Sequence, residues 1–189
     1  MGKPGKLFVV SGPSGSGKST LSRALTEKTG VQVSVSATTR NRGEEEVEGK
    51  DYFFLSQEEF LRQIKAGGFL EYAQVFGHYY GTPAGPVQKM LSAGQSVVLE
   101  IDVQGAGQVF KQFPEAEGIL VLPPDEDELH RRLSCRGRDD AQTIKKRLAK
   151  AKWEIQQAQD CPNFKHVIVN ENLQVAIEQI IAIVKNEQP

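Results

Sequence analysis

The stretch that decides the fold of this chain is Gly12-Pro13-Ser14-Gly15-Ser16-Gly17-Lys18-Ser19. It fits the pattern G-x-x-x-x-G-K-[ST], in which a glycine-rich loop binds phosphate groups. An apolar run, Leu7-Phe8-Val9-Val10, precedes the loop and predicts a buried strand. The segment after the loop, from Thr20 to Lys28, carries leucines at helical spacing. Because the order strand, loop and helix aims backbone N–H groups at an anion, the sequence predicts a nucleoside triphosphate site.

Two side chains of this loop have specific tasks. Lys18 can reach the β- and γ-phosphates, and the hydroxyl of Ser19 can bind Mg²⁺. The glycines allow positive φ angles and a close approach of the backbone to the anion. The alternative is a Gly/Ser-rich turn that matches the pattern by chance, and the flanking strand and helix argue against it.

The composition is that of one globular domain of 189 residues, with 39% hydrophobic residues, 25% charged residues and a net charge of −1. So little net charge gives the molecule no electrostatic reason to coat nucleic acid or an anionic membrane. Cys135 and Cys161 form neither a CxxC pair nor a metal-binding spacing. The N-terminal segment is too short and polar for a signal peptide, and no apolar run approaches a membrane span. We therefore expect a cytoplasmic protein.

Strands and helices alternate along the rest of the chain. Strands are predicted over 31–36, 52–55, 96–102, 118–122 and 167–169, and the stretch 69–80 is predicted to form strands or a hairpin. Helices are predicted over 56–66, 83–93, 103–113, 141–159 and 173–184, with another after Pro124 that ends at Arg136 before a Gly137 cap. This alternation predicts an α/β fold of three layers, α/β/α, with a central parallel sheet. Only residues 34–81 depart from it, and they predict an inserted small α+β lobe.

Two acids end the predicted strand 96–102. Glu100 and Asp102 are two residues apart and therefore share one face of the strand. In open α/β sheets ligands bind at this end of the strands, so we expect the acids to face Mg²⁺ with its waters, or the phosphate acceptor. The alternative is a strand end that merely reaches solvent.

A basic run extends from Arg131 to Lys152 inside this mildly acidic protein. Arg132 and Arg136 lie four residues apart on one helix face, and Arg147 on the next helix can face them. The run could be a solvated basic face or a nucleic-acid patch, although no aromatic residues are interleaved. A helical lid that closes its arginines over a triphosphate explains the spacing better.

Several further motifs occur in one order and register over nearly the whole chain, and together they closely resemble the guanylate kinase family. They are Ser36-Ala37-Thr38-Thr39-Arg40, Gly49-Lys50-Asp51-Tyr52-Phe53-Phe54, Tyr79-Tyr80-Gly81-Thr82, Glu100-Ile101-Asp102-Val103-Gln104-Gly105, Arg132-Leu133 to Arg136-Gly137, and Val167-Ile168-Val169-Asn170.

The resemblance implies a P-loop NTPase core over 1–33, 82–125 and 160–189, a GMP-binding lobe over 34–81 and a lid over 126–159. It implies transfer of the γ-phosphoryl group of ATP to GMP, and to dGMP, giving ADP and GDP. This Mg²⁺-dependent step belongs to guanine nucleotide synthesis and recycling. ATP and GMP are then the partners, without nucleic acid or membrane, and the sequence leaves both a monomer and a homo-oligomer open.

The resemblance also assigns roles to individual residues of this chain. The implied catalytic residues are Lys18, Arg40, Arg132, Arg136 and Arg147. The implied ATP-binding residues are Gly12, Pro13, Ser14, Gly15, Ser16, Gly17, Lys18, Ser19, Thr20 and Asn170. The implied GMP-binding residues are Ser36, Arg40, Arg42, Tyr52, Glu71, Tyr80, Thr82 and Glu100, and the implied Mg²⁺ ligands are Ser19 and Asp102.

The chemistry of the acceptor residues agrees with these roles. Guanine presents two adjacent donors, N1–H and N2–H₂, and one carboxylate, such as that of Glu71, can accept both. AMP lacks this pair, so a buried Glu71 would reject AMP by several kcal/mol. Arg40 can hold the acceptor phosphate with two parallel hydrogen bonds. The alternatives are a solvent-exposed glutamate and, for Tyr52 and Tyr80, tyrosines at the edge of the core.

One segment departs from the family pattern T-T-R-x-P-R-x-G-E. This chain has Thr38-Thr39-Arg40-Asn41-Arg42-Gly43-Glu44-Glu45-Glu46, so Gly43 stands at the place of the second arginine and Glu46 at that of the glutamate. Either Arg42 reaches the phosphate from one position earlier, or an anchor is missing and GMP binds more weakly. We predict that Arg42 substitutes.

The implied reaction needs no general base. A phosphate monoester has its second pKa near ~6, so GMP is mostly a dianion at neutral pH. His78, His130 and His166 accordingly form no catalytic pattern. Competing predictions are another nucleoside monophosphate or small-molecule kinase on the same core, a non-catalytic guanylate-kinase-like protein-binding module, and a nucleic-acid-binding NTPase. The intact phosphate loop and lid disfavour the binding module.

Overall fold

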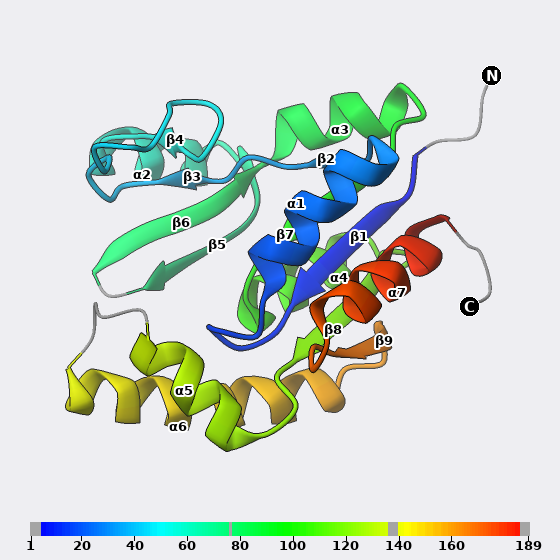
Figure 1. Ribbon diagram of the computed structural model, residues 1–189. Helices are drawn as coiled ribbons and strands as arrows, with labels where there is room; N and C mark the ends of the chain where they lie inside the picture. Colours follow the sequence, from blue (N-terminus) through cyan, green and yellow to red (C-terminus); the bar gives the residue numbers. More distant parts are fainter. Residues whose placement is uncertain (1–4, 76, 136–139, 186–189) are drawn as a thin grey trace.

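The computed structural model describes residues 5–75, 77–135 and 140–185, and the strands of these residues form two sheets (Figure 1). The larger sheet is parallel and has five strands in the order β2-β7-β1-β8-β9. Their bounds are β2 Gln32–Val33, β7 Val97–Glu100, β1 Leu7–Ser11, β8 Glu117–Leu122 and β9 Phe164–Val169. The predicted parallel sheet is therefore confirmed.

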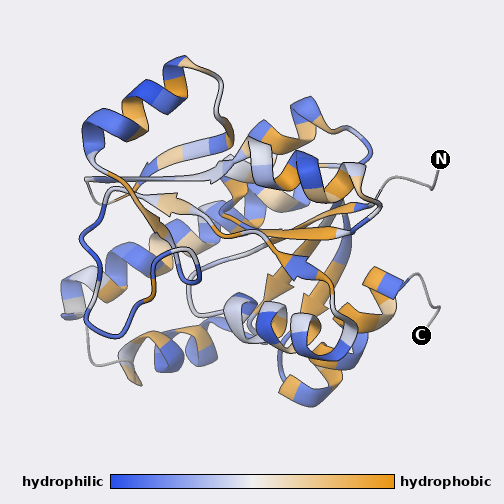
Figure 2. Cartoon of the chain, turned by 90° about the horizontal axis from the view of Figure 1, so that it is seen from above, coloured by the Kyte–Doolittle hydropathy of each residue, from blue (hydrophilic) through white to orange (hydrophobic). Residues whose placement is uncertain are grey.

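Helices cover both faces of the parallel sheet, because the side chains of a strand alternate between its faces. Phe8 and Val10 of β1 pack with the apolar residues of α1 (Lys18–Thr29) and α7 (Leu173–Lys185). Leu7 and Val9 pack on the other side with α3 (Ala84–Ser92) and α4 (Val103–Gln112). Figure 2 shows the hydrophobic strands in the middle and helices that are hydrophilic on one side. This is the three-layer α/β/α arrangement that the alternation predicted.

The smaller sheet has four strands in the order β4-β3-β6-β5 and lies within residues 37–83. Its strands are β4 Phe53–Phe54, β3 Ala37–Thr38, β6 His78–Pro83 and β5 Phe69–Val75, and β5 pairs with β6 in antiparallel fashion. Helix α2 (Gln57–Lys65) packs on this sheet through Phe60, whose ring stacks on that of Phe69 with centroids 4.3 Å apart. Ser56 caps α2 by accepting a hydrogen bond from the backbone N–H of Glu59.

A pair of helices, α5 (Glu126–Cys135) and α6 (Ala141–Gln159), forms the region predicted as the lid. They pack against each other through Leu129, Leu133 and Ala151. In Figure 1 this pair and the smaller sheet flank the end of the parallel sheet where β1 leads into the phosphate loop. The predicted lid arginine Arg136 and the predicted cap Gly137 lie outside the described residues.

The predicted strand over 31–36 is wrong in its extent. Pairing with β7 covers only Gln32 and Val33, and the backbone N–H of Ser34 makes a last bond to the carbonyl of Val98. The chain then leaves the parallel sheet, because Ala37 and Thr38 pair with β6 of the smaller sheet. The division into a core, a lobe over 34–81 and a lid over 126–159 stays a prediction. Among the described helices, none combines the length and apolar character needed to cross a bilayer.

Candidate active site

The phosphate loop connects β1 to α1 and turns sharply at its glycines. Gly12 and Gly17 have φ angles of 142° and 102°. A Cβ atom on Gly17 would lie 2.1 Å from the Nδ2 atom of Asn170, so glycine is required there for space as well as for conformation. The ammonium group of Lys18 lies inside the loop and donates to the carbonyl oxygens of Gly12 at 2.6 Å and Pro13 at 3.0 Å.

Two of the predicted site residues, Asn170 and Arg132, support the phosphate loop by hydrogen bonds to its backbone. The amide of Asn170, only 4% exposed, donates to the carbonyl oxygen of Ser16 at 2.8 Å. Arg132 donates to the carbonyl oxygens of Asn170 at 2.8 Å and Ser16 at 3.4 Å, and to the carboxylate of Glu128 at 2.7 Å. Neither Asn170 nor Arg132 belongs to the described residues that line the cavity in front of the loop. Their hydrogen bonds therefore hold the loop in shape.

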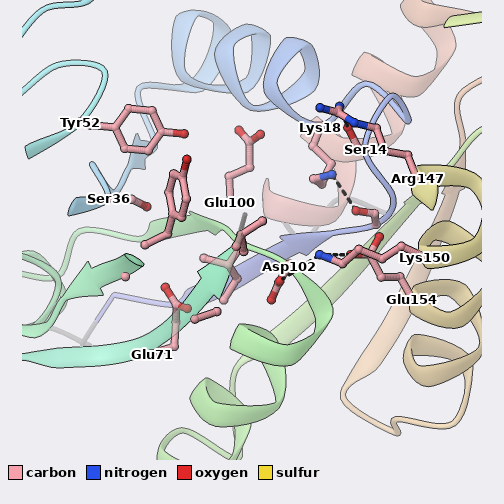
Figure 3. Close-up of a pocket in the computed structure, with 16 residues that line it drawn as sticks. Ser14, Lys18, Ser36, Tyr52, Glu71, Glu100, Asp102, Arg147, Lys150 and Glu154 are labelled. Carbon is pink, nitrogen blue, oxygen red and sulfur yellow. Dashed lines mark hydrogen bonds and ion pairs between the residues drawn. The ribbon is translucent and has the colours of Figure 1, made fainter. Parts of the chain in front are cut away.

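One cavity of about 320 Å³ joins the phosphate loop to the smaller sheet. In Figure 3 Lys18 and Ser14 lie on one side of it and Glu71 on the other, with Glu100 and Asp102 between them. The structure thus brings part of the predicted set to one cavity, while Arg40, Arg42 and Thr82 are not among its described lining residues. Those that line the cavity are Gly12, Ser14, Lys18, Ser36, Tyr52, Glu71, Tyr80, Glu100, Asp102 and Arg147.

Glu71 is a buried carboxylate, 5% exposed, at the acceptor side of the cavity. Burial raises its pKa to about 7, and the negative charge of Asp102 adds to the rise, while a hydrogen bond from Thr82 opposes it. The hydroxyl of Thr82 donates to Oε1 of Glu71 at 2.7 Å. Thr82 is 1% exposed and is not among the described lining residues, so its hydroxyl contacts Glu71 rather than the cavity. Ser36 does line the cavity.

Tyr52 and Tyr80 stand edge to face beside Glu100, with ring centroids 6.1 Å apart. Burial raises the pKa of Tyr52. The guanidinium of Arg40 lies 5.5 Å from the ring centre of Tyr52, and its two terminal nitrogens donate to the carboxylate of Glu46. Arg42 has an exposed side chain and is absent from the described residues that line the cavity. The structure therefore offers no contact in support of the prediction for Arg42.

The structure pairs the predicted Mg²⁺ ligand Ser19 with Glu100, whereas Asp102 lines the same cavity but makes other contacts. The hydroxyl of Ser19 donates to Oε1 of Glu100 at 2.5 Å. Asp102 caps α4 by accepting from the backbone N–H of Gly105 at 2.9 Å, and its other oxygen lies 3.9 Å from the ammonium nitrogen of Lys150. Asp102 lies past the end of β7 and caps α4, so strand alternation does not fix its direction, although both carboxylates line the cavity.

The hydroxyl and carboxylate oxygens of Ser19 and Glu100 fit Mg²⁺, which prefers oxygen ligands. Within the described part of the chain, no three His, Cys, Asp or Glu side chains gather into a metal cage. Mg²⁺ usually takes one or two protein ligands together with substrate phosphates and waters.

Helix α6 supplies cavity residues that the sequence prediction missed. Lys150 and Glu154 line the cavity with Arg147, whose guanidinium lies 3.4 Å from the hydroxyl of Ser14 (Figure 3). Burial raises the pKa of Glu154, and Lys150, 3.3 Å away, opposes that rise. Arg147, Lys150 and Glu154 are separated by three and then four residues, which places them on one helix face. This spacing is visible in the sequence and could have predicted that Lys150 and Glu154 accompany Arg147.

Comparisons with known proteins agree with this geometry. The sequence model of the family described as Guanylate kinase matches residues 4–187. A guanylate kinase of Thermus thermophilus is 46% identical over 187 residues, which are 99% of this chain and 82% of that protein. A guanylate kinase of Vibrio parahaemolyticus is 46% identical over 191 residues, with 100% of this chain and 90% of that protein covered.

A solved structure agrees as well. The crystal structure of guanylate kinase from Anaplasma phagocytophilum is similar with a TM-score of 0.79 at 34% identity, and the match covers 98% of this chain and 87% of that chain. The family match over nearly the full length, the identities and the shared fold lead to one conclusion. This chain belongs to the guanylate kinase family.

Proposed function

We propose that this chain transfers the γ-phosphoryl group of ATP to GMP, and to dGMP, in a Mg²⁺-dependent reaction that gives ADP and GDP. The observation that carries the proposal is the shared cavity, which has Lys18 of the phosphate loop at one side and the buried carboxylate of Glu71 at the other. In this proposal the two nucleotides meet at the cavity, with the acceptor base at Glu71 and the donor phosphates at the phosphate loop.

Glu71 is the residue that would read the acceptor base. Its ionised carboxylate can accept hydrogen bonds from N1–H and N2–H₂ of guanine, while Thr82 holds Oε1 in place. With adenine, the buried carboxylate would lack these donors, at a cost of several kcal/mol in discrimination. Tyr52 and Tyr80 line the cavity and would contact the acceptor phosphate together with Arg40, whose guanidinium lies 5.5 Å from the ring centre of Tyr52.

At the donor side the backbone of the phosphate loop and Lys18 would bind the phosphates of ATP. Ser19 and Glu100 would hold Mg²⁺, directly or through its waters, and the ion would neutralise charge that develops on the transferred group. Arg147 and Lys150 on α6 add positive charge from the lid side. Arg132 contributes by fixing the loop, and a role for Arg136 and for Asn170 in contact with substrate stays a prediction.

No group of the protein needs to remove a proton, because GMP presents a dianion as the nucleophile. The task of the side chains is to bring two anions into line against their repulsion and to exclude water, so that ATP is not hydrolysed. The cytoplasmic location expected from the sequence also stays a prediction.

The test is phosphoryl transfer by the Lys18→Ala variant, followed with ATP labelled at the γ-phosphate. We expect the wild-type chain to move the label into GDP rather than into free phosphate. Lys18→Ala is expected to lower turnover by a factor of about 10²–10⁴, because charge stabilisation at the transferred group is lost. Circular dichroism checks that the variant is folded, and near-normal turnover in a folded variant would remove the loop from its assigned role.

A further inference from the structure

We propose that Glu46 is a positioning residue: it holds the guanidinium of Arg40 in the orientation that receives the acceptor phosphate. This inference rests on the proposed function, because it concerns how the same acceptor site is built. No role for Glu46 follows from the fold alone, since it lies in the irregular segment between β3 and β4.

The contact between the two side chains is bidentate. Nη1 of Arg40 donates to Oε2 of Glu46 at 2.9 Å, and Nη2 donates to Oε1 at 2.7 Å. Nη1 also donates to the carbonyl oxygen of Asn41 at 2.9 Å. The rings of Tyr52 and Phe54 lie on the guanidinium at 5.5 and 5.9 Å from their centres. The carboxylate of Glu46 thus fixes the guanidinium along the edge formed by Nη1 and Nη2, and the two aromatic rings fix its plane.

The remaining edge of the guanidinium is the one that can serve a substrate. A guanidinium has five N–H groups, and the three bonds above leave Nε–H and the second hydrogen of Nη2, which lie on one edge. An edge of this kind matches two oxygens of a phosphate. The pKa of Arg40 is raised chiefly by its hydrogen bonds to Glu46 and further by a hydrogen bond to the hydroxyl of Tyr80, which lines the cavity. A phosphate beside Tyr80 would therefore meet this edge of Arg40, while the bonds of Arg40 to Glu46 stay in place.

Glu46 also folds the loop that departs from the family pattern. The backbone N–H of Gly43 donates to Oε2 of Glu46 at 2.7 Å. A Cβ atom on Gly43 would lie 3.1 Å from the same oxygen, so the carboxylate occupies the space beside the position where the pattern has a second arginine. Glu46 therefore fixes both the guanidinium of Arg40 and the turn at Gly43, while the substitution by Arg42, whose side chain is exposed, stays a prediction.

The experiment is steady-state kinetics of the Glu46→Gln variant at saturating ATP, with Glu44→Gln as the matched control. Glu44 is an exposed acid of the same loop, and both variants remove one negative charge. We expect Glu46→Gln to raise the KM for GMP by about tenfold and to leave the KM for ATP unchanged. Glu44→Gln is expected to keep both constants. Removing a negative charge would by itself favour GMP binding, so a weakening reports the lost orientation.

Two further measurements separate positioning from a general structural defect. Guanosine, which has no phosphate, should inhibit the wild-type chain and Glu46→Gln equally. In an Arg40→Ala background Glu46→Gln should add less than about twofold to the KM for GMP, because Glu46 acts through Arg40. If Glu46→Gln does not fold, Glu46→Asp serves instead, with a smaller rise because its shorter carboxylate keeps only part of the fork.

The outcomes distinguish this inference from the proposed function. If the wild-type chain phosphorylates GMP and Glu46→Gln has an unchanged or lower KM for GMP, the function stands and the role of Glu46 is overturned. The role is likewise overturned if guanosine inhibition weakens in parallel with GMP. If the wild-type chain does not phosphorylate GMP, the proposed function itself fails.

Discussion

A buried carboxylate is costly unless something compensates its charge, and at Glu71 the hydroxyl of Thr82 supplies only part of that compensation. Burial and the neighbouring Asp102 therefore raise its pKa to about 7. The burial of the Glu71 carboxylate also makes it selective between bases. A guanine that brings two N–H donors compensates the charge, and a base without them leaves it buried and unsatisfied.

The pKa of Glu71 predicts a pH dependence of base recognition. Because the pKa in the free protein is raised to about 7, Glu71 is protonated below that pH and must lose a proton to accept both guanine donors. The inhibition constant of guanosine should therefore rise as the pH falls below 7, approaching about tenfold per pH unit. Guanosine is chosen because the phosphate of GMP titrates near ~6. The inhibition by guanosine should be weak and independent of pH in Glu71→Gln, and a flat profile in the wild-type chain would contradict the account.

Among the elements, α4 helps to position the acceptor site because it packs against Glu71. Its first turn is capped by Asp102, and its Gly105 packs directly on the carboxylate of Glu71. A Cβ atom on Gly105 would lie 2.5 Å from Oε2 of Glu71, whereas a Cβ atom on Gly107 of the same helix would meet no atom within 4 Å. The two glycines thus offer a matched pair of substitutions.

We predict different effects for Gly105→Ala and Gly107→Ala: only Gly105→Ala should change the kinetics. Gly107→Ala should stabilise the protein by about 0.5–1 kcal/mol, because alanine favours the helix, and should leave the kinetics unchanged. Gly105→Ala should push the carboxylate of Glu71 aside and raise the KM for GMP by about tenfold or more, with the KM for ATP preserved. Thermal denaturation and kinetics with each substrate check both. Equal kinetics of the two variants would show that Gly105 does not position Glu71.

Helices α5 and α6 contain two arginines with different contacts. Arg132 on α5 holds the phosphate loop through Ser16 and Asn170, while Arg147 on α6 lines the cavity. We predict that Arg132→Ala lowers both turnover and stability, by about 1.5–3 kcal/mol for the lost charged hydrogen bonds, or several degrees in Tm. Arg147→Ala should lower turnover with a clearly smaller change in Tm. Calorimetry and kinetics on both variants test this. A larger fall in Tm for Arg147→Ala than for Arg132→Ala would contradict the assignment of loop support to Arg132.

At the scale of the whole molecule, the site exists because two sheets and a helix pair meet at one cavity. Lys18 comes from the loop after β1, Glu71 from β5 of the smaller sheet and Arg147 from α6. Each part alone offers a binding surface for one phosphate or one base. Their meeting gives a site with a donor side and an acceptor side.

The sequence allowed much of this assembly to be predicted. The phosphate loop follows from a local pattern, and the bounds of α6, Ala141–Gln159, follow from helical spacing. Contacts between distant segments could not be read from such patterns. Examples are the bond of Ser19 to Glu100, the support of the loop by Asn170, and the short extent of β2, which ends at Val33. Strand pairing decides the last of these, and pairing depends on tertiary contacts.

On the proposed function, the acceptor side of the cavity recognises guanine while the donor side binds ATP. The most direct measurement is ADP production from ATP and Mg²⁺ with GMP, dGMP, AMP, UMP or CMP as the acceptor, each compared by kcat/KM. We predict rapid turnover with GMP and dGMP, and at least about 10³-fold lower kcat/KM with AMP, because AMP leaves the carboxylate of Glu71 unpaired. Turnover with AMP but not with GMP would contradict the account.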